Sequence, residues 1–379
     1  MTRPIRILQV VGRMDRGGAE TWLMHVLQHI DRSRFHFDFL THTQTKCAYD
    51  DEIQALGSSL ALCENPKSPW AYRRLLNSRE RYDVVHSHLH HYSGFVLRCA
   101  AKAKIPARIA HSHSDTQRMD RKASMLRRAY LGVASGCIER YATHGLAASR
   151  AAAQALFGPR WGADSRFSVL HCGVDLDNFE SDGLNRRDLC QEFGIRADAL
   201  IFAHIGRFTE AKNHGFLIKI FARIRELEPR AVLLLAGEGE LRAEVEQAIA
   251  GAGLEDSCRL IGVRNDVPRF LGGCVDALLL PSRWEGLPLV LIESQAAGVP
   301  CLCSDVITTE AVEISNLVLR MALAQPVEEW ARAALDIAQI RTCRRGSARP
   351  LRGTRFDIEV GVDRLEKLYS DSMTPKGDS

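Results

Sequence analysis

The stretch Pro281-Ser-Arg-Trp-Glu-Gly-Leu-Pro-Leu-Val-Leu-Ile-Glu-Ser-Gln-Ala-Ala-Gly-Val-Pro300 decides the fold of this chain. A run with the pattern of a buried strand, Val275–Leu280, comes directly before it. The order of apolar and turn-forming residues predicts a strand, a tight loop, a helix and a further strand. Pro288 suits the first turn of that helix, because its missing N–H group needs no partner there.

Two glutamates occupy this motif, Glu285 in the loop and Glu293 inside the predicted helix. The free amides of Gly286 and Leu287 lie at the helix N-terminus, which favours an anion such as phosphate. A carboxylate beside a phosphate repels the ligand unless the carboxylate binds hydroxyl groups, which sugars and riboses supply. Together, the two features predict a binding site for a sugar nucleotide.

The motif resembles the E-x7-E signature of retaining glycosyltransferases of family 4, and the resemblance extends over most of the chain. It implies an α/β architecture of the GT-B type, in which two Rossmann-like, doubly wound parallel-sheet domains face a central cleft. It further implies that Glu293 holds the ribose hydroxyls and that Glu285 positions the transferred sugar. Amides near Gly286 and Leu287 would help to hold the diphosphate.

Length and composition fit this class of protein. The 379 residues suffice for two domains, and 46% hydrophobic with 25% charged residues is ordinary for a globular protein. No apolar run approaches the ~18 residues that span a bilayer, and the N-terminus lacks a signal-peptide pattern. The 11 cysteines form no C-x-x-C pair, which favours reduced thiols and a cytoplasmic location.

The net charge of +4 is unevenly distributed along the chain. Lys and Arg exceed Asp and Glu in the N-terminal half, whereas acids are in excess in the C-terminal half. A basic half is suited to an anionic membrane surface or to a lipid-diphosphate acceptor. No nucleic-acid-binding motif accompanies the charge, so nucleic acid is not an expected partner.

Strand-like and helix-like runs alternate along the chain, which predicts parallel, doubly wound sheets. The resemblance implies an N-terminal acceptor-side domain at residues 1–179, a nucleotide-sugar donor domain at 190–355, and a final helix at 356–372 that packs back on the first domain. A polar linker is expected at 180–188. The predicted strands are Ile5–Val11, Phe35–Thr41, Val84–Ser87, Arg108–His111, Leu200–Arg207, Val232–Ala236, Arg259–Ile261, Ala277–Leu280 and Pro300–Cys303, and Thr21–Ile30 and Gly94–Ala103 are predicted helices.

Arg207 and Lys212 stand just beyond the first strand of the predicted donor domain, where cations can hold a diphosphate leaving group. The segment Gly206-Arg-Phe-Thr-Glu-Ala-Lys-Asn resembles the family motif G-R-x(4)-K-N, whose Arg and Lys contact the donor diphosphate. Fixed positive charge can stabilise a departing diphosphate without Mg²⁺. We therefore expect no metal and no cofactor, with the nucleotide-diphosphate sugar as co-substrate.

Three glycine-containing loops complete the expected donor site. Gly17 and Gly18 resemble the G-G-A-E loop of the family, which approaches the donor phosphate and sugar; an ordinary glycine turn has the same appearance. Glu238 lies in Gly237-Glu-Gly, which is read either as a loop near the donor or as a plain strand-to-helix turn. Val263 and Arg264 resemble the segment that borders the nucleotide base.

Histidines concentrate in Asp83-Val-Val-His-Ser-His-Leu-His-His91 and in Arg108-Ile-Ala-His-Ser-His-Ser114. Many family members keep an active-site histidine at the second place. We favour His113 as the catalytic candidate over His111, although period-two alternation puts both on one face of an extended chain. A zinc site is the competing interpretation, but no cysteine or carboxylate completes an obvious ligand set.

Two further segments are open to a functional reading. Asp175-Leu-Asp177 matches the metal-binding D-x-D motif of unrelated transferases, but its setting resembles the structural N-G-V-D segment of family 4, with Cys172 in place of Asn. Gln117–Tyr130 combines cations with apolar residues at helical spacing, which suits either an anionic membrane surface or a solvated basic helix. The basic stretch Arg341–Arg352 has no assigned role.

The sequence therefore predicts a retaining glycosyltransferase. It would move a hexose or N-acetylhexosamine from a nucleotide-diphosphate sugar, with UDP favoured over GDP. The acceptor would be a glycan or a polyprenyl-diphosphate-linked oligosaccharide in surface polysaccharide biosynthesis, at the inner face of the cell membrane. The alternatives are a sugar-nucleotide epimerase or hydrolase on the same fold, and a non-catalytic subunit that binds a nucleotide sugar for a partner transferase.

Overall fold

The computed structural model describes residues 3–77, 81–117, 120, 123–180, 186–340 and 348–374. The chain divides into two compact units, Met1–Gly173 together with Ile358–Ser379, and Val174–Asp357. The first boundary lies earlier than residue 179, because Val174 forms a parallel bridge with Asp357 and its N–H group donates to the carbonyl of Phe356. The segment after Gly173 therefore pairs with the segment that leads back to the first unit.

The first unit is built on a parallel sheet with strand order β3-β2-β1-β4-β5-β6-β7 in the described residues. Its predicted strands are confirmed within a residue or so at each end, and the short strands β3, β6 and β7 are additional. The edge strands β3 and β7 have three residues each, which are too few for a period to emerge. The bounds are β1 Ile5–Val10, β2 Phe35–Thr41, β3 Leu60–Leu62, β4 Val84–Ser87, β5 Ala107–Ser112, β6 His144–Ala147 and β7 Phe167–Val169.

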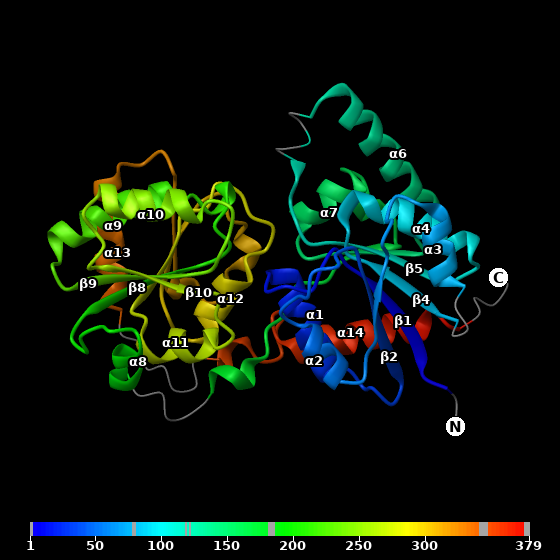
Figure 1. The fold of residues 1–379 in the computed structure, drawn as a ribbon, viewed down its shortest axis with the longest axis horizontal. Helices are drawn as coiled ribbons and strands as arrows, with labels where there is room; N and C mark the ends of the chain where they lie inside the picture. The colour runs from blue at the N-terminus through cyan, green and yellow to red at the C-terminus, as the bar shows by residue number, and fades with distance from the viewer. Residues whose placement is uncertain are drawn as a thin grey trace. The chain divides into compact units, whose positions relative to one another are not determined.

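Helices cover both faces of this sheet (Figure 1). On one face, α1 packs against α14, the last helix of the chain, so segments from opposite ends of the sequence lie side by side. On the other face, α3, α4 and α6 pack in sequence and cover an apolar core that includes Leu8, Val85 and Ala110. The bounds are α1 Gly18–His29, α2 Asp50–Ala55, α3 Pro69–Leu76, α4 Ser93–Lys102, α6 Met125–Tyr141, α7 Arg150–Phe157 and α14 Ile358–Asp371.

The second unit has a parallel sheet with strand order β10-β9-β8-β11-β12-β13 in the described residues. Phe202, Phe221 and Trp330 form part of an apolar core of this unit, where α9 packs against α13. The strands are β8 Leu200–Ile205, β9 Ala231–Ala236, β10 Cys258–Gly262, β11 Ala277–Leu280, β12 Cys301–Ser304 and β13 Val318–Met321; the helices are α8 Arg186–Glu192, α9 His214–Leu227, α10 Arg242–Gly251, α11 Val267–Cys274, α12 Leu289–Ala296 and α13 Val327–Ala338.

Both sheets have the doubly wound order, in which the chain reverses its direction of growth between two central strands. The reversal lies between β1 and β4 in the first unit and between β8 and β11 in the second. Ligands of open parallel sheets bind outside the carboxyl ends of the strands at this switch point. The predicted α/β fold with two parallel doubly wound sheets is thereby confirmed.

Three predicted segments differ from the structure or lie partly outside it. Residues 181–185 of the expected linker lie outside the described residues, and α8 already begins at Arg186, whose guanidinium pairs with Asp276 at 2.9 Å. In the basic segment predicted at Gln117–Tyr130, helix α6 begins at Met125, and residues 118, 119, 121 and 122 lie outside the described residues. Residues 341–347 of the basic C-terminal stretch are likewise outside the description. Within the described part of the chain, no helix is both long and apolar enough to cross a bilayer.

Candidate active site

The loops after β8 and β11 bring Lys212 and Glu285 together in the second unit. The Lys212 Nζ atom lies 2.6 Å from Oε1 of Glu285, and the Ser282 hydroxyl donates to the same oxygen at 2.9 Å. Both charged side chains are largely buried, with 15% and 14% exposed. The predicted pair of a diphosphate-binding cation and a sugar-positioning acid is therefore adjacent in the fold.

Backbone and side-chain hydrogen bonds fix these two loops to each other. Asn213, which follows the 3₁₀ turn Glu210–Lys212 with a left-handed φ of 58°, donates from Nδ2 to the carbonyl of Pro281 at 3.0 Å. The N–H group of Arg283 donates to the carbonyl of Ala211 at 2.7 Å. Lys212 is therefore held by its own backbone neighbours beside the loop of Glu285.

Gly206 makes room for Lys212. A Cβ atom at position 206 would lie 2.7 Å from Cε of Lys212 and 3.1 Å from its Cδ, so any side chain there would displace the lysine. Arg207, the next residue, is exposed and has no ion-pair or hydrogen-bond partner among the described residues. Its guanidinium is free to accept an anion at the carboxyl end of β8.

Glu293 lies on α12, the helix that follows the Glu285 loop. Its side chain is partly buried, and burial raises the pKa of the carboxyl from 4.5 to about 7. No hydrogen-bond partner for this carboxyl occurs among the described residues. Gly286 and Leu287 precede Pro288, which is the N-cap of α12 rather than a residue of its first turn.

The glycines around Glu238 have a packing explanation. Gly237 has a φ of 146°, and a Cβ atom there would lie 2.1 Å from the carbonyl oxygen of Gly206. A Cβ atom at Gly239 would lie 2.4 Å from the carbonyl oxygen of Phe208. These positions let the β9 loop pack against the β8 loop. The Glu238 carboxylate forms an ion pair with Arg242. The contact between Glu238 and the sugar donor stays a prediction.

The third loop of this sheet edge holds Val263 and Arg264 after β10. Val263 is 50% exposed and available to a planar ligand. Arg264 is engaged by two acids, Asp266 at 2.6 Å and Glu192 at 2.8 Å. Its guanidinium also lies 5.3 Å from the centre of the Phe193 ring. The Arg264 side chain therefore stabilises the loop. Contact between this segment and the nucleotide base stays a prediction.

In the first unit, the glycine loop ends at the start of α1. Gly17 is the N-cap, with φ −146° and ψ 163°, and Gly18 is the first helical residue. Gly17 has no side chain with which to cap this first turn. The N-terminus of α1 thus lies beyond β1, at the switch point of the sheet, which is the place that the predicted phosphate contact requires.

Histidines from β4 and β5 form a stacked array on the face that α1 and α14 cover. The rings of His111 and His113 lie 4.2 Å apart, as period-two alternation predicts. His111 is fully buried against Trp22 at a ring distance of 5.1 Å, whereas His113, which follows the strand, keeps part of its surface exposed. Solvent exposure therefore distinguishes His113 from His111, which sequence spacing could not do.

These imidazoles are neutral at physiological pH. Burial lowers the pKa of His86 and of His113 to about 3. The pKa values of His88 and His111 are also far below the usual range, again mainly because of burial. The Nε2 atom of the neutral His113 ring lies 2.8 Å from the Nδ1 atom of His88.

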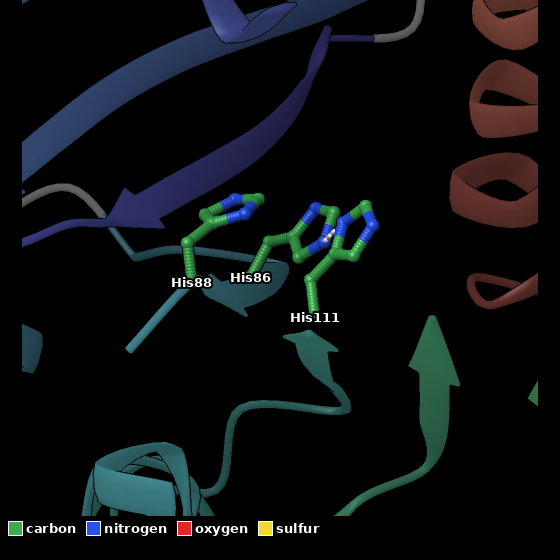
Figure 2. A group of neighbouring side chains, drawn as sticks. All are labelled: His86, His88 and His111. Atoms are coloured by element: carbon green, nitrogen blue, oxygen red, sulfur yellow. Dashed lines mark hydrogen bonds between the residues drawn. The ribbon is translucent and has the colours of Figure 1, made fainter. Parts of the chain in front are cut away.

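Three of the histidines could offer nitrogen ligands to a metal. The ligand atoms of His86, His88 and His111 lie within 4.8 Å of one another (Figure 2). Tetrahedral Zn²⁺ with Zn–N bonds of ~2.0–2.1 Å would hold its ligand atoms about 3.4 Å apart. Hydrogen bonds already engage the cluster, as between Nε2 of His86 and Nδ1 of His111 at 3.2 Å. That the protein needs no metal stays a prediction.

Several residues of the site gave no signal in the sequence. Tyr369 of α14 contacts His86 through its hydroxyl at 2.8 Å, and Gln9 of β1 contacts His88 at 2.9 Å. Both are single polar residues within apolar patterns, which is the one feature that marks them. Ser282, directly after β11, carries no distinguishing pattern either, because a serine in a turn is common.

Comparison with known proteins identifies the class. Residues 16–178 match the family described as Glycosyltransferase Family 4, and residues 185–349 match the family described as Glycosyl transferases group 1. The chain is 33% identical over 374 residues to EpsF of Bacillus subtilis (strain 168), a protein assigned as a glycosyltransferase, with 97% of each chain covered. The chain therefore belongs to the family 4 glycosyltransferases, and it is a glycosyltransferase with a GT-B fold.

Two further relatives extend the comparison. The Escherichia coli UDP-Gal:alpha-D-GlcNAc-diphosphoundecaprenol alpha-1,3-galactosyltransferase is 26% identical over 342 residues, with 86% of each chain covered. The crystal structure of Anabaena Alr3699/HepE in complex with UDP and glucose matches the fold with a TM-score of 0.81 at 19% identity, covering 97% of this chain and 100% of that one. The second likeness concerns the fold alone.

Proposed function

We propose that this glycosyltransferase moves a hexose or N-acetylhexosamine, with retention of configuration, from a nucleotide-diphosphate sugar to a glycan or lipid-linked oligosaccharide in surface polysaccharide biosynthesis. UDP is the favoured nucleotide. The support for this donor class is the combination, at one sheet edge, of two cations and an unpaired carboxyl group. The relative from Escherichia coli uses UDP-Gal and a diphosphoundecaprenol-linked acceptor, as its name states.

The observation that carries the proposal is the state of Arg207 and Glu293. An exposed guanidinium without a partner is ready for a diphosphate, and a carboxyl held at a pKa of about 7 is ready for hydroxyl donors. Each group lacks the partner that it would find on a sugar nucleotide. Lys212 would exchange part of its contact with Glu285 for the diphosphate, which frees Glu285 to accept hydrogen bonds from sugar hydroxyls.

The proposed reaction follows from these roles. The bond between the anomeric carbon and the diphosphate oxygen breaks, and Arg207 and Lys212 stabilise the charge that develops on the departing diphosphate. The acceptor oxygen attacks the face from which the diphosphate leaves, and its proton passes to a diphosphate oxygen. Gly17 and Gly18 would border the donor phosphate. No metal is needed in this scheme, because fixed cations carry the positive charge.

A lipid-linked acceptor requires access to a membrane surface, and α6 supplies a suitable face in the first unit (Figure 1). Met125, Leu126 and Val133 of this helix are 87%, 85% and 68% exposed. Arg127 and Arg128 stand on the same turns. Exposed apolar side chains beside cations suit insertion at an anionic headgroup layer. We propose that α6 contacts the inner face of the membrane.

Release of nucleoside diphosphate from a panel of UDP- and GDP-sugars, with and without membrane lipid extract, tests the proposal. We expect lipid-dependent release from one UDP-sugar, lost in Glu293→Ala, and an α-configured product by NMR when the donor is α-linked. Release without any acceptor would indicate a hydrolase or an epimerase. Tight UDP binding without release under any condition would indicate a subunit that binds the nucleotide for a partner.

A further inference from the structure

We propose that Gln9, His88 and Cys172 are positioning residues that hold His113 as a neutral ring with its proton on Nε2. The inference rests on the proposed function together with the expectation, implied by the family resemblance, that His113 is the catalytic histidine. It assigns a role to two buried residues, Gln9 and Cys172, and to the partly buried His88, none of which belongs to the donor-binding motifs.

The four residues form one continuous hydrogen-bonded chain. Sγ of Cys172 lies 3.7 Å from Nδ1 of His113. Nε2 of His113 lies 2.8 Å from Nδ1 of His88. Nε2 of His88 lies 2.9 Å from the side-chain oxygen of Gln9. Each imidazole therefore uses both ring nitrogens inside the first unit, and the ring of His113 is held at two points.

The two ends of the chain agree on the position of the protons. At one end, the Gln9 oxygen only accepts, so His88 must carry its proton on Nε2 and accept through Nδ1. His113 must then donate from Nε2. At the other end, burial raises the pKa of the Cys172 thiol, which stays an S–H donor and needs the lone pair on Nδ1 of His113. Both arguments give the Nε2–H form of His113.

A second branch fixes the orientation of the Gln9 amide. Its nitrogen lies 3.4 Å from the hydroxyl of Tyr369, and that hydroxyl lies 2.8 Å from Nδ1 of His86. The tyrosine accepts from Gln9 and donates to His86, which in turn donates from Nε2 to His111. The branch ends at Nε2 of His111, a buried atom without a hydrogen-bond partner among the described residues. Tyr369, near the end of α14, thus orients the amide that sets the tautomer.

A fixed neutral imidazole suits the proposed chemistry. The transferred sugar gains oxocarbenium character as the diphosphate departs. An imidazolium beside it would oppose that charge, whereas a neutral ring does not. A defined tautomer also fixes the dipole of the ring, and two hydrogen bonds limit its rotation. The array therefore gives the catalytic candidate His113 a polar, uncharged ring in one orientation.

Nitrogen-15 NMR of histidine-labelled protein tests the proposal directly. In the wild type we expect His88 and His113 to show the Nε2–H pattern from pH 6 to 8. In Gln9→Met, which keeps the side-chain size but removes the acceptor, we expect mixed tautomers for both. We also expect kcat to fall on the order of 10- to 100-fold, with KM for the donor unchanged. Gln9→Glu keeps an acceptor oxygen and should restore the His88 tautomer, while its charge raises the pKa of that ring.

The matched control is Gln28→Met, which changes an exposed glutamine of α1 and should leave the spectrum and kcat unaltered. Cys172→Ala tests the other end of the chain and should release Nδ1 of His113 without changing His86. An Nδ1–H form of His113 in the wild type would overturn the proposal even if a Gln9 variant fails to fold. Zinc-dependent shifts of His86, His88 and His111 would overturn it in favour of a metal site.

The spectra do not depend on turnover, so the two proposals can fail separately. The expected tautomer without transfer from any donor would count against the proposed function alone. Transfer by a wild type whose His113 carries its proton on Nδ1 would count against the positioning chain alone.

Discussion

Lys212 and Glu285 are 73 residues apart in the chain, yet Nζ of the lysine lies 2.6 Å from Oε1 of the glutamate. The lysine follows β8 and the glutamate follows β11, and these strands are neighbours at the point where the sheet reverses its order. The contact pairs the positive charge of the lysine with the negative charge of the glutamate. It also links the residue expected to bind the diphosphate to the residue expected to position the sugar.

Replacing Lys212 should reduce catalysis far more than folding. Lys212→Met removes a cation that stabilises the leaving diphosphate, and we expect kcat/KM to fall about 10²- to 10³-fold. Steady-state release of nucleoside diphosphate measures the effect. Lys219→Met, at an exposed position of α9, is the control and should keep full activity. Equal losses in the two variants would show that a general charge effect, rather than the contact with the donor, is responsible.

Adding a single methyl group beside Lys212 should have a similar, smaller effect. In Gly206→Ala the new Cβ would lie 2.7 Å from Cε of Lys212, so the lysine must leave its present position. We expect a decrease of about 10- to 100-fold in kcat/KM with little change in thermal stability. Gly215→Ala, in α9 with no atom near its added Cβ, should be silent. Full activity of Gly206→Ala would mean that Lys212 need not occupy this position.

The raised pKa of Glu293 predicts a pH-dependent stability. The folded protein keeps this carboxyl protonated up to a pH of about 7, whereas the unfolded chain loses the proton near 4.5. The contribution of the Glu293 carboxyl to the free energy of unfolding is therefore fully present below pH 4.5, and it is lost as the pH rises through 7. Glu293→Gln, which cannot ionise, should be more stable than the wild type at pH 8.5 by on the order of 1–2 kcal/mol, and the difference should shrink toward pH 5.

Thermal unfolding and UDP titration check this prediction together. Glu293→Gln should bind UDP about 10-fold more weakly at pH 8, because an amide replaces a charged acceptor of ribose hydroxyls. Glu244→Gln, an exposed position of α10, should change neither property. A variant that is less stable than the wild type at high pH would contradict the assigned environment of Glu293.

The exposed face of α6 should govern membrane binding. A Met125→Asp and Leu126→Asp double variant loses apolar surface and adds negative charge, so we expect at least about 10-fold weaker binding to vesicles that contain anionic lipid. Co-sedimentation measures the binding. Trp70→Ser is the control, because Trp70 is 75% exposed in the same unit but lies outside α6. Transfer to a water-soluble acceptor should be unaffected in both, which separates membrane contact from catalysis.

Much of the fold could be predicted from local pattern alone. Buried parallel strands read as apolar runs, and the runs at Phe35–Thr41, Val84–Ser87 and Ala277–Leu280 coincide with β2, β4 and β11. The helix predicted within the motif Pro281–Pro300 is also confirmed, as α12 at Leu289–Ala296. The short strands β3 and β7 were missed, because three residues each are too few for a period to be recognised.

The composition of the candidate site was also readable from sequence, because cations, acids and glycines at strand ends are local features. The side chains that pair with these residues could not be predicted from the sequence. The sequence could not tell that Arg264 would be engaged by Glu192, because these residues are 72 positions apart and meet only when the loop after β10 folds beside α8. Nor could it separate His111 from His113, because both share one face of the strand.

The sequence by itself determined which residues share a strand, a helix or a face, since periods of 2 and 3.6 residues are set by backbone geometry. Only the tertiary structure decided which distant groups meet. Tyr369 reaches His86 because α14 returns to the first unit after the whole of the second. Lys212 reaches Glu285 because β8 and β11 become neighbours in the sheet. Strand order and helix docking are long-range packing choices, and no local period encodes them.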